Sequence, residues 1–293
     1  MPRNWKSSPG FATAALIAVT AVWGWTFLIV KDAIAKMPVM DFLAVRFVIA
    51  AVVMFAVRPQ SLWRMNRRGL WQGAIIGFLL GMSYITQTYG LRTVSPGVSG
   101  FITGMSVVFT PAVMWLVLRR KVSLNIWIAV ALALIGLAFL SLHGWAFGGG
   151  ELLTVACAIF VAFQVIGLGE WSPHHDAYGL ATVQIITAAV MMLIAAAPGG
   201  ITLPPDMVTW GTVGVTAVLA TALAFVVQTW AQSLISPTHI AVILTMEPVF
   251  AGVFSVAAGK DHLTFRIIAG VVCVLAGMLI AQVKFHRHKE ISR

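Results

Sequence analysis

The chain repeats itself at a fixed distance. When residues 85–140 are moved forward by 141 positions, without a gap, they meet matching residues: Gln87-Thr88 falls on Gln228-Thr229, Ser95-Pro96 on Ser236-Pro237, Met105 on Met246, Val108-Phe109 on Val249-Phe250, and Gly136 on Gly277. Each half holds five apolar stretches of membrane length, and a unit with an odd number of crossings is turned upside down when it is duplicated in tandem. Inverted repeats place a binding site at their shared interface near the bilayer midplane and are typical of secondary transporters. The repeat therefore predicts two inverted halves and favours transport.

The composition predicts a chain that lies mostly in lipid. Hydrophobic residues make up 60% of the sequence and charged residues 10%, and most apolar stretches approach the roughly 20 residues that a helix needs to cross the hydrocarbon. The predicted spans are 11–30, 40–57, 70–90, 97–118, 124–142, 151–168, 179–197, 208–231, 238–258 and 267–283. We expect an all-α integral membrane protein with ten transmembrane helices, arranged as two inverted five-helix repeats around a central cavity. The first repeat is predicted over 11–142, the second over 151–283, and a basic cytoplasmic tail over 284–293.

The basic residues predict the orientation. The net charge is +10, and with ten spans and the N-terminus inside, thirteen Lys and Arg residues lie on the cytoplasmic side and five outside. The inner set is Arg3, Lys6, Arg58, Arg64, Arg67, Arg68, Arg119, Arg120, Lys121, Lys284, Arg287, Lys289 and Arg293, and the outer set is Lys31, Lys36, Arg92, Lys260 and Arg266. The bias follows the positive-inside rule and places both termini in the cytoplasm. The basic excess is thus an orientation signal, and nucleic acid is not an expected partner. The first stretch is too long and too rich in Trp for a signal peptide.

One acid and one base lie within the predicted spans. A buried ionisable group in a membrane is costly and is by default a candidate for function, usually with a partner. Glu247 either carries a proton or meets a substrate ammonium, or it is structural, as an ion pair with Arg46 or as a protonated acid bonded to a neighbouring helix. Arg46 either snorkels to the interface or forms that pair, or it contacts a substrate carboxylate. Pro248 removes a backbone donor and frees a carbonyl to face a cavity.

The eighth predicted span carries the clearest polar face. Its stripe, spaced i, i+4, i+7 and i+11 along one side of a helix, consists of Thr221, Phe225, Gln228 and Gln232. In the first half, Tyr84 and Gln87 occupy the positions equivalent to Phe225 and Gln228, so each half offers an aromatic ring followed by an amide. Amides within a span need hydrogen-bond partners, which either a polar cavity or a neighbouring helix supplies.

Further rings, one amide and two methionines complete the candidate substrate-binding set. They are Trp23, Trp25, Tyr89, Met105, Phe163, Gln164, Trp230 and Met246. Aromatic rings stack on or enclose an apolar side chain. The two methionines, equivalent by the repeat, would form an adaptable apolar wall, although ordinary packing explains them equally well.

Stripes of glycine predict close packing between helices. They are Gly73, Gly77 and Gly81 in the third span, and Gly100 and Gly104 in the fourth. We expect this packing within one subunit, and a monomer or weak homodimer. Cys157 and Cys273 lie in apolar spans without disulfide or metal spacing. The sequence holds no phosphate loop, nucleophile–His set or paired carboxylates, so no enzymatic activity, cofactor or metal is expected.

Several short motifs resemble those of a known family. They are Trp23-Gly24-Trp25-Thr26-Phe27, Arg46-Phe47, Val108-Phe109-Thr110-Pro111 and Glu247-Pro248-Val249-Phe250-Ala251. These strings are similar to signatures of the EamA family in the drug/metabolite transporter superfamily, in particular its exporters of aromatic amino acids and metabolites, and the resemblance covers about residues 11–283. It implies alternating access through a central cavity lined by helices 1, 3, 4, 6, 8 and 9, with helices 5 and 10 closing one side.

The sequence departs from the family pattern in two loops. The family often has a Gly-Glu pair after helices 4 and 9, where this chain has Arg119-Arg120 and Gly259-Lys260-Asp261. No role is therefore carried over to those acids.

The residues and the resemblance together predict an inner-membrane secondary transporter of a bacterium, whose partners are the lipid bilayer and a small-molecule substrate. The resemblance implies export of small organic metabolites, first of all aromatic or other neutral amino acids. Efflux of cationic drugs or quaternary ammonium compounds is the alternative within transport. A membrane-embedded lipid-modifying enzyme is the alternative from another class; it needs acidic or His clusters at one interface, whereas the predicted cytoplasmic loops are basic.

Overall fold

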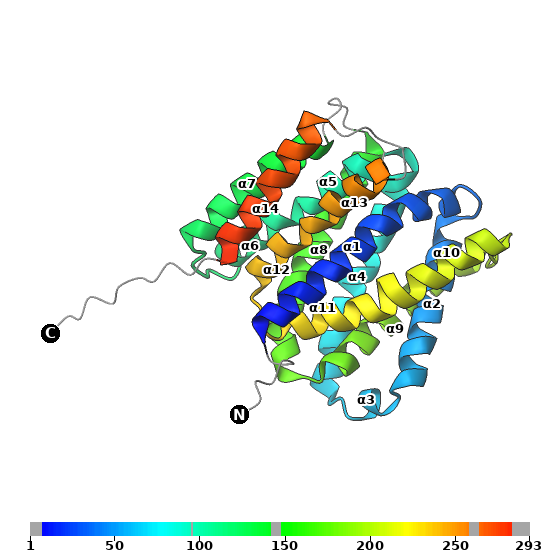
Figure 1. Cartoon of the computed structure of the whole chain (residues 1–293). Helices are drawn as coiled ribbons and strands as arrows, with labels where there is room; N and C mark the ends of the chain where they lie inside the picture. Colours follow the sequence, from blue (N-terminus) through cyan, green and yellow to red (C-terminus); the bar gives the residue numbers. More distant parts are fainter. Residues whose placement is uncertain (1–7, 95, 142–147, 258–263, 283–293) are drawn as a thin grey trace.

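The chain forms a bundle of helices (Figure 1). The computed structural model describes residues 8–94, 96–141, 148–257 and 264–282, and within these ranges it contains no strand. The helices are α1 (Pro9–Ile34), α2 (Val39–Val57), α3 (Gln60–Trp63), α4 (Arg67–Thr93), α5 (Pro96–Gly104), α6 (Ser106–Leu116), α7 (Leu124–Ser141), α8 (Gly149–Trp171), α9 (Ala177–Ala196), α10 (Met207–Ala217), α11 (Ala224–Gln232), α12 (Pro237–Leu244), α13 (Met246–Ala257) and α14 (Phe265–Gln282). Two 3-10 turns, η2 (Ser172–His174) and η3 (Ala197–Gly199), follow α8 and α9, and a π-helical turn, η4 (Val218–Leu223), joins α10 to α11.

Within the described residues, each predicted span falls on helical structure. Among the described residues, seven helical segments are long and apolar enough to cross a membrane, and shorter apolar helices lie at Ile102–Leu116, Leu124–Gly136 and Ile268–Gly277. The prediction of an all-helical membrane protein is therefore confirmed. The sequence analysis did not predict the interruptions within the fourth, eighth and ninth spans, although Pro111 and Pro248 lie near two of them.

Short polar side chains begin several of the helices. The side chains of Asn66, Asp176 and Asp206 each accept a hydrogen bond from a backbone N–H in the first turn of α4, α9 and α10. Such caps satisfy amides that have no partner within the helix. At Asp206 the hydrogen bond from Lys36, reinforced by the backbone and side chain of Thr209, lowers the pKa of the carboxyl to about 2.

The fourth and ninth predicted spans are both broken near the middle. α5 ends and α6 begins around Met105, and α12 ends and α13 begins around Thr245. At each break the amide N–H bonds three residues back, from Met105 to Ile102 and from Thr245 to Val242. The two breaks lie within one residue of positions related by the 141-residue offset, so the two halves share an interrupted helix.

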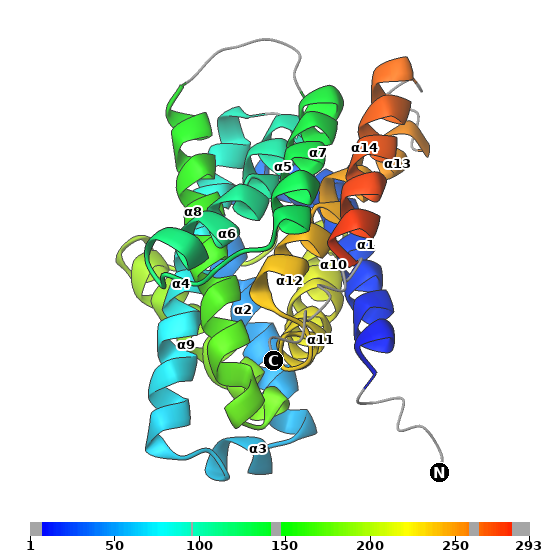
Figure 2. The same ribbon diagram turned by 90° about the vertical axis from the view of Figure 1, so that its left-hand side faces the viewer.

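The connections define two ends of the bundle. We call the end around α3, where α2 ends and α4 begins, the α3 face; α8 also ends there, since Arg58 and Asp176 form an ion pair of 3.3 Å. We call the other end, where α1 turns into α2, the opposite face; α10 begins there, since Lys36 and Asp206 form an ion pair of 2.9 Å. Figure 2 shows α3 at the lower end and the beginning of α8 at the upper end.

Glycines bring several helices into close contact. The stripe Gly73, Gly77 and Gly81 of α4 faces α9, and a side chain at Gly77 would meet the Gln184 carbonyl oxygen at 2.5 Å. Gly100 lies next to Pro248, and both Gly100 and Gly104 line a cavity between the helices. The first stripe thus packs within one chain.

The contact between α7 and α14 is reciprocal. A side chain at Gly136 would meet the Gly270 carbonyl at 2.6 Å, and one at Gly277 would meet the Ala129 carbonyl at 2.8 Å. Positions 129 and 270, like 136 and 277, are 141 residues apart. Because the higher-numbered end of α7 meets the lower-numbered end of α14, the two equivalent helices run antiparallel.

Candidate functional site

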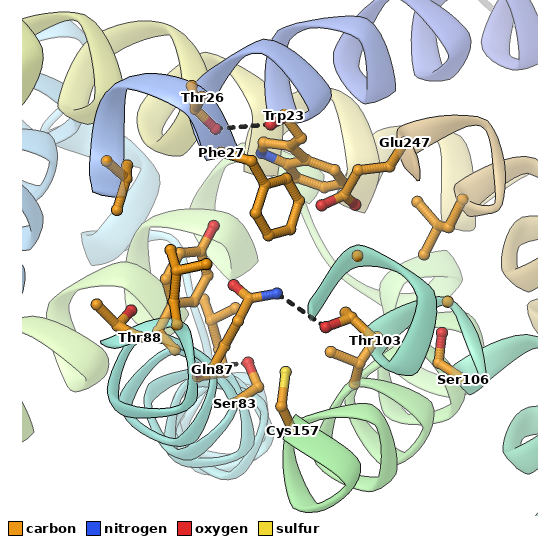
Figure 3. Close-up of a pocket in the computed structure, with 18 of the residues that line it drawn as sticks. Trp23, Thr26, Phe27, Ser83, Gln87, Thr88, Thr103, Ser106, Cys157 and Glu247 are labelled. Carbon is orange, nitrogen blue, oxygen red and sulfur yellow. Dashed lines mark hydrogen bonds between the residues drawn. The ribbon is translucent and has the colours of Figure 1, made fainter. Parts of the chain in front are cut away.

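A cavity of about 100 Å³ lies between the two halves of the bundle (Figure 3). Its wall is formed by residues of α1, α2, α4, α5, α6, α8, α11, α12 and α13. It extends from the middle of the helices to Val30 and Leu91, near the ends of α1 and α4 at the opposite face. The helices implied by the family resemblance all contribute, and α2 adds Arg46.

Arg46 provides the positive charge of the cavity wall. Its side chain is 3% exposed, and its Nε donates to Thr221 Oγ1 at 2.9 Å. The guanidinium lies over the ring of Tyr84, 4.9 Å from the centroid, and one nitrogen donates weakly to the Tyr84 hydroxyl at 3.4 Å. Snorkelling is therefore wrong for this residue. A guanidinium has five N–H donors, and no carboxylate of the described residues lies within ion-pair distance of it.

The π-turn η4 fixes this part of the wall. Its Ala220 carbonyl accepts a hydrogen bond from Trp23 Nε1 at 2.8 Å, while Thr221 donates to the Thr216 carbonyl at 2.9 Å and accepts from Arg46. π-Turns widen a helix locally and occur often at functional sites. Here the turn ties α1 and α2 to the same segment, which holds Trp23 and Arg46 at the cavity.

A relay of amides closes the cavity towards the α3 face. Gln228 Nε2 donates to Gln164 Oε1 at 3.4 Å, and Gln164 Nε2 donates to Gln184 Oε1 at 3.4 Å. Gln184 Nε2 ends the relay on Thr229 Oγ1 at 2.9 Å. Gln228 Oε1 is buried and has no hydrogen-bond partner among the described residues. A buried polar atom without a partner is unusual in a folded protein.

Glu247 provides the negative charge. Figure 3 shows its carboxylate beside the rings of Trp23 and Phe27 and across the cavity from Gln87. No hydrogen bond or ion pair to this carboxylate is found within the described part of the chain. The hypothesis of a Glu247–Arg46 pair is wrong in this structure, because the Arg46 guanidinium is held instead by Thr221 and Tyr84.

The structure brings some predicted substrate-binding residues into the wall and leaves others outside. Those that line the cavity are Trp23, Tyr84, Gln87, Gln164, Phe225 and Gln228. Those outside it are Trp25, Tyr89, Met105, Phe163, Trp230 and Met246. Trp25, Tyr89 and Trp230 each follow a lining residue by two positions, which places them about 200° away around the helix. Trp25 and Phe163 are accordingly 37% and 39% exposed on the outside of the bundle.

The remaining outliers have other surroundings. Met246 packs in an apolar cluster with Val107 and Val249, and Met105 lies at the break between α5 and α6. Trp230 packs edge-on against Phe11 of α1, with ring centroids 5.8 Å apart. Tyr89 lines a second pocket, of about 420 Å³, formed with Arg92 and the turn between α1 and α2.

Small polar residues in the wall escaped the sequence analysis. They are Thr26, Ser83, Thr88, Thr103 and Ser106. On α4 a signal was present, since Leu80, Tyr84, Gln87 and Leu91 are spaced as one face of a helix and Ser83 and Thr88 flank it. Gln184 is the only amide in its predicted span, and an amide within a span needs hydrogen-bond partners, so the sequence also held a signal for the relay.

Three ion pairs join the two halves of the chain. Within the described residues they are Lys36–Asp206 at the opposite face, and Arg58–Asp176 and Arg120–Glu170 at the α3 face. The Arg120–Glu170 pair has two contacts, from the two terminal nitrogens of the guanidinium to the two carboxylate oxygens. Each pair therefore spans the boundary between the repeats.

Comparison with known proteins identifies the family. A model of the EamA-like transporter family matches residues 10–142 and again residues 148–282. The chain belongs to the EamA-like transporter family. Membership of the drug/metabolite transporter superfamily follows, and the resemblance seen in the sequence is confirmed.

The relatives of this EamA-like transporter are themselves described as transporters. An uncharacterized transporter of Archaeoglobus fulgidus is 31% identical over 278 residues, covering 94% of this chain and 86% of its own. The uncharacterized transporter YoaV of Bacillus subtilis is 23% identical and covers 94% of this chain and 97% of its own. A solved crystal structure matches 94% of this chain and 97% of its own with a TM-score of 0.79 at 15% identity, which shows a shared fold. The chain is therefore a membrane transporter.

The first family motif of this EamA-like transporter divides between cavity and packing. Trp23, Thr26 and Phe27 line the cavity, while Trp25 points outwards. Gly24 packs against α13, where a side chain would meet the Glu247 carbonyl oxygen at 2.6 Å. The motif thus places rings and a hydroxyl in the wall and lets α1 approach the acidic helix.

Proposed function

We propose that this transporter exports neutral amino acids, by alternating access, across a bacterial cytoplasmic (inner) membrane. The observation that carries the proposal is that a guanidinium and a carboxylate face one cavity, each without a counter-charge among the described residues. A charge that is buried without a partner is costly. An amino acid zwitterion supplies both missing partners, its carboxylate to Arg46 and its ammonium to Glu247.

The rest of the wall suits a small apolar side chain. Trp23, Phe27 and Phe225 are rings, and Leu80 and Val161 add aliphatic surface. Aromatic rings offer a large apolar contact area to such a side chain. The volume of about 100 Å³ favours the smaller neutral amino acids, so an aromatic side chain would need the cavity to widen.

The packing of the helices supports the proposed architecture of ten transmembrane helices in two inverted repeats. α7 and α14 occupy equivalent places in the repeat, yet they run antiparallel through a reciprocal contact. Antiparallel equivalents are expected when the second five-helix unit is upside down. We take 11–142 and 151–283 as the two rocking units, with both termini in the cytoplasm as the basic residues predict.

Counterflow in proteoliposomes tests the function. Vesicles that hold the purified protein and unlabelled leucine are expected to take up radiolabelled leucine. Arg46→Gln and Glu247→Gln are each expected to slow uptake by about tenfold or more, because a hydrogen bond to a charged group contributes roughly 1.5–3 kcal/mol. Phe78→Ala, at a ring on α4 that is 50% exposed, is the control for a general effect of substitution.

The size-exclusion profile of each variant shows whether it remains folded. Leucine uptake at the wild-type rate in both folded charge variants would refute the assignment of the site. Absence of exchange with the whole set of neutral amino acids would refute the proposed substrate class.

Efflux of cationic drugs is the second candidate, favoured by the carboxylate of Glu247, which has no counter-charge among the residues that the structure describes. The presence of Arg46 in the same wall and the small volume weigh against it. Flux of tetraethylammonium that is lost in Glu247→Gln, without any flux of leucine, would select this alternative.

A further inference from the structure

The two halves of the chain contribute unequal residues to the cavity. At the 141-residue offset, several positions of the first half and their equivalents both line it, among them Gln87 and Gln228, Thr103 and Leu244, and Ser106 and Glu247. The amide is retained, whereas a hydroxyl is replaced by an aliphatic group and another by a carboxylate. The differences indicate where the repeat has been specialised for an unsymmetrical ligand.

In the first half the amide nitrogen has a hydroxyl as its acceptor. Gln87 Nε2 donates to Thr103 Oγ1 at 3.1 Å. In the second half the equivalent partner is Leu244, whose side chain has no oxygen. Gln228 Nε2 instead donates to Gln164. Its Oε1 has no hydrogen-bond partner within the described part of the chain, and the residue is only 2% exposed.

The relay determines which end of the Gln228 amide is free. Each Nε2 along Gln228, Gln164 and Gln184 donates to the next oxygen. The oxygen of Gln228, a residue of the cavity wall, is consequently left over at the start of the relay. An amide oxygen can only accept a hydrogen bond, so a ligand group that binds to it must be a hydrogen-bond donor.

Besides the Gln228 oxygen and the Glu247 carboxylate, the backbone carbonyl of Leu244 is a third acceptor. Pro248 has no N–H to donate to the carbonyl of Leu244, four residues earlier, and α12 ends at Leu244. The C-terminal end of a helix carries partial negative charge, and interrupted helices offer such carbonyls to cations in transporters. Leu244, Glu247 and Pro248 all line the cavity.

We propose that Gln228 Oε1, the Glu247 carboxylate and the Leu244 carbonyl form a subsite for the primary ammonium group of the substrate, an assignment that rests on the proposed function. A primary ammonium has three N–H donors, which match three acceptors. Leu244, unlike Thr103, has no hydroxyl that could donate to the Gln228 oxygen. The same oxygen atoms would also suit a small metal cation such as Na⁺, and the experiment separates the two.

Ligand binding to the purified protein tests the subsite without transport. Isoamylamine and 4-methylpentanoate are leucine without its carboxylate and without its ammonium. In a Na⁺-free potassium buffer, both are titrated by calorimetry. Glu247→Gln is expected to weaken binding of isoamylamine roughly 10- to 100-fold, the loss expected for a hydrogen bond to a charged group, and to leave 4-methylpentanoate unchanged.

A second variant avoids removing a charge. By the repeat, Leu244→Thr brings a hydroxyl to Gln228 as Thr103 does to Gln87. Because Gln228 Nε2 already donates to Gln164, the new hydroxyl is expected to donate to Gln228 Oε1 and so to weaken isoamylamine binding several-fold. Leu152→Thr, at a leucine of α8 that is 63% exposed, is the matched control and is expected to bind as the wild type does.

The outcomes separate the subsite from the proposed function. Isoamylamine binding that is unchanged in both folded variants overturns the subsite, even if leucine is transported. Stabilisation by Na⁺ alone, lost in Glu247→Gln, assigns the acceptors to a metal ion and likewise overturns it. Binding of isoamylamine that depends on Glu247, in a protein that does not exchange leucine, supports the subsite and refutes only amino acid transport.

Discussion

At the scale of single residues, Gly24 determines how closely α1 approaches α13. A side chain there would meet the Glu247 carbonyl oxygen at 2.6 Å and the Ala251 amide nitrogen at 2.7 Å. Both are backbone atoms, so neither can swing aside as a flexible side chain would. The neighbour Trp23 and the carboxylate of Glu247 face the same cavity, which makes this contact important for the site.

Gly24→Ala is therefore expected to destabilise the protein by about 1–3 kcal/mol, the usual cost of inserting an extra methyl group into a tightly packed contact. Thermal unfolding of the purified protein measures the effect. Gly214→Ala on α10 is the control, because an added Cβ would meet nothing within 4 Å there. Equal melting temperatures for the two variants would contradict the close packing of α1 on α13.

Single residues also show how far the sequence predicts the site. It selected Trp23, Gln87, Gln228, Arg46 and Glu247 because polar and aromatic groups are unusual within membrane spans. Their relative angles along one helix followed from the helical period. The absolute rotation of each helix did not, because rings on a membrane helix face lipid as readily as a cavity; only packing against neighbours decides this.

At the scale of helices, the sequence predicted where the helical spans lie better than it predicted the breaks and the π-turn within them. Length and apolarity predicted each helical span, since a membrane leaves the backbone few other solutions. The breaks had a partial signal in Pro111 and Pro248. The π-turn had none, because Val218–Leu223 contains neither Gly nor Pro; its conformation is tied to tertiary hydrogen bonds from Trp23 and Arg46.

The contact between α4 and the turn before α9 is expected to depend on pH. His175 bonds Gln72 Oε1 at 2.7 Å, and burial, followed by the charges of His174 and Arg68, lowers its pKa below the ordinary 6.5. The unfolded chain then binds the proton more readily than the folded one. The stabilising contribution is present above pH 6.5 and is lost as the pH falls through the lowered folded-state pKa.

Melting temperatures at pH 8 and pH 5 measure this contribution. The wild type is expected to lose stability on acidification, and His175→Gln, which cannot be protonated, is expected to lose less. His174→Gln serves as the control and should keep most of the pH dependence. A His175→Gln variant with the full wild-type decrease would show that another group is responsible.

At the scale of the whole molecule, the contacts between the halves suit relative motion. The ion pairs Lys36–Asp206 and Arg58–Asp176 join the halves at the two ends of the bundle, and their side chains are about as exposed as those of ordinary surface pairs. Pairs of this kind contribute roughly 0–1 kcal/mol, so they break readily. α7 and α14 instead meet through glycines at backbone distance. We infer that the two ion pairs open and close while the contact between α7 and α14 holds the halves together.

Inverted repeats predict a labelling pattern that no other arrangement of the two halves would give. Arg92 lies near the end of α4, and Ser236 follows the end of α11, the corresponding helix of the second half. Inversion therefore requires the two residues to reach opposite sides of the membrane. In a protein with Cys157 and Cys273 replaced by Ala, a membrane-impermeant maleimide is expected to label Arg92→Cys in intact cells and Ser236→Cys only after permeabilisation. The reverse pattern would keep the inversion and overturn the orientation given by the basic residues. Labelling of both from one side would show that the halves are parallel, and no rocking of inverted halves about a shared cavity would then be possible.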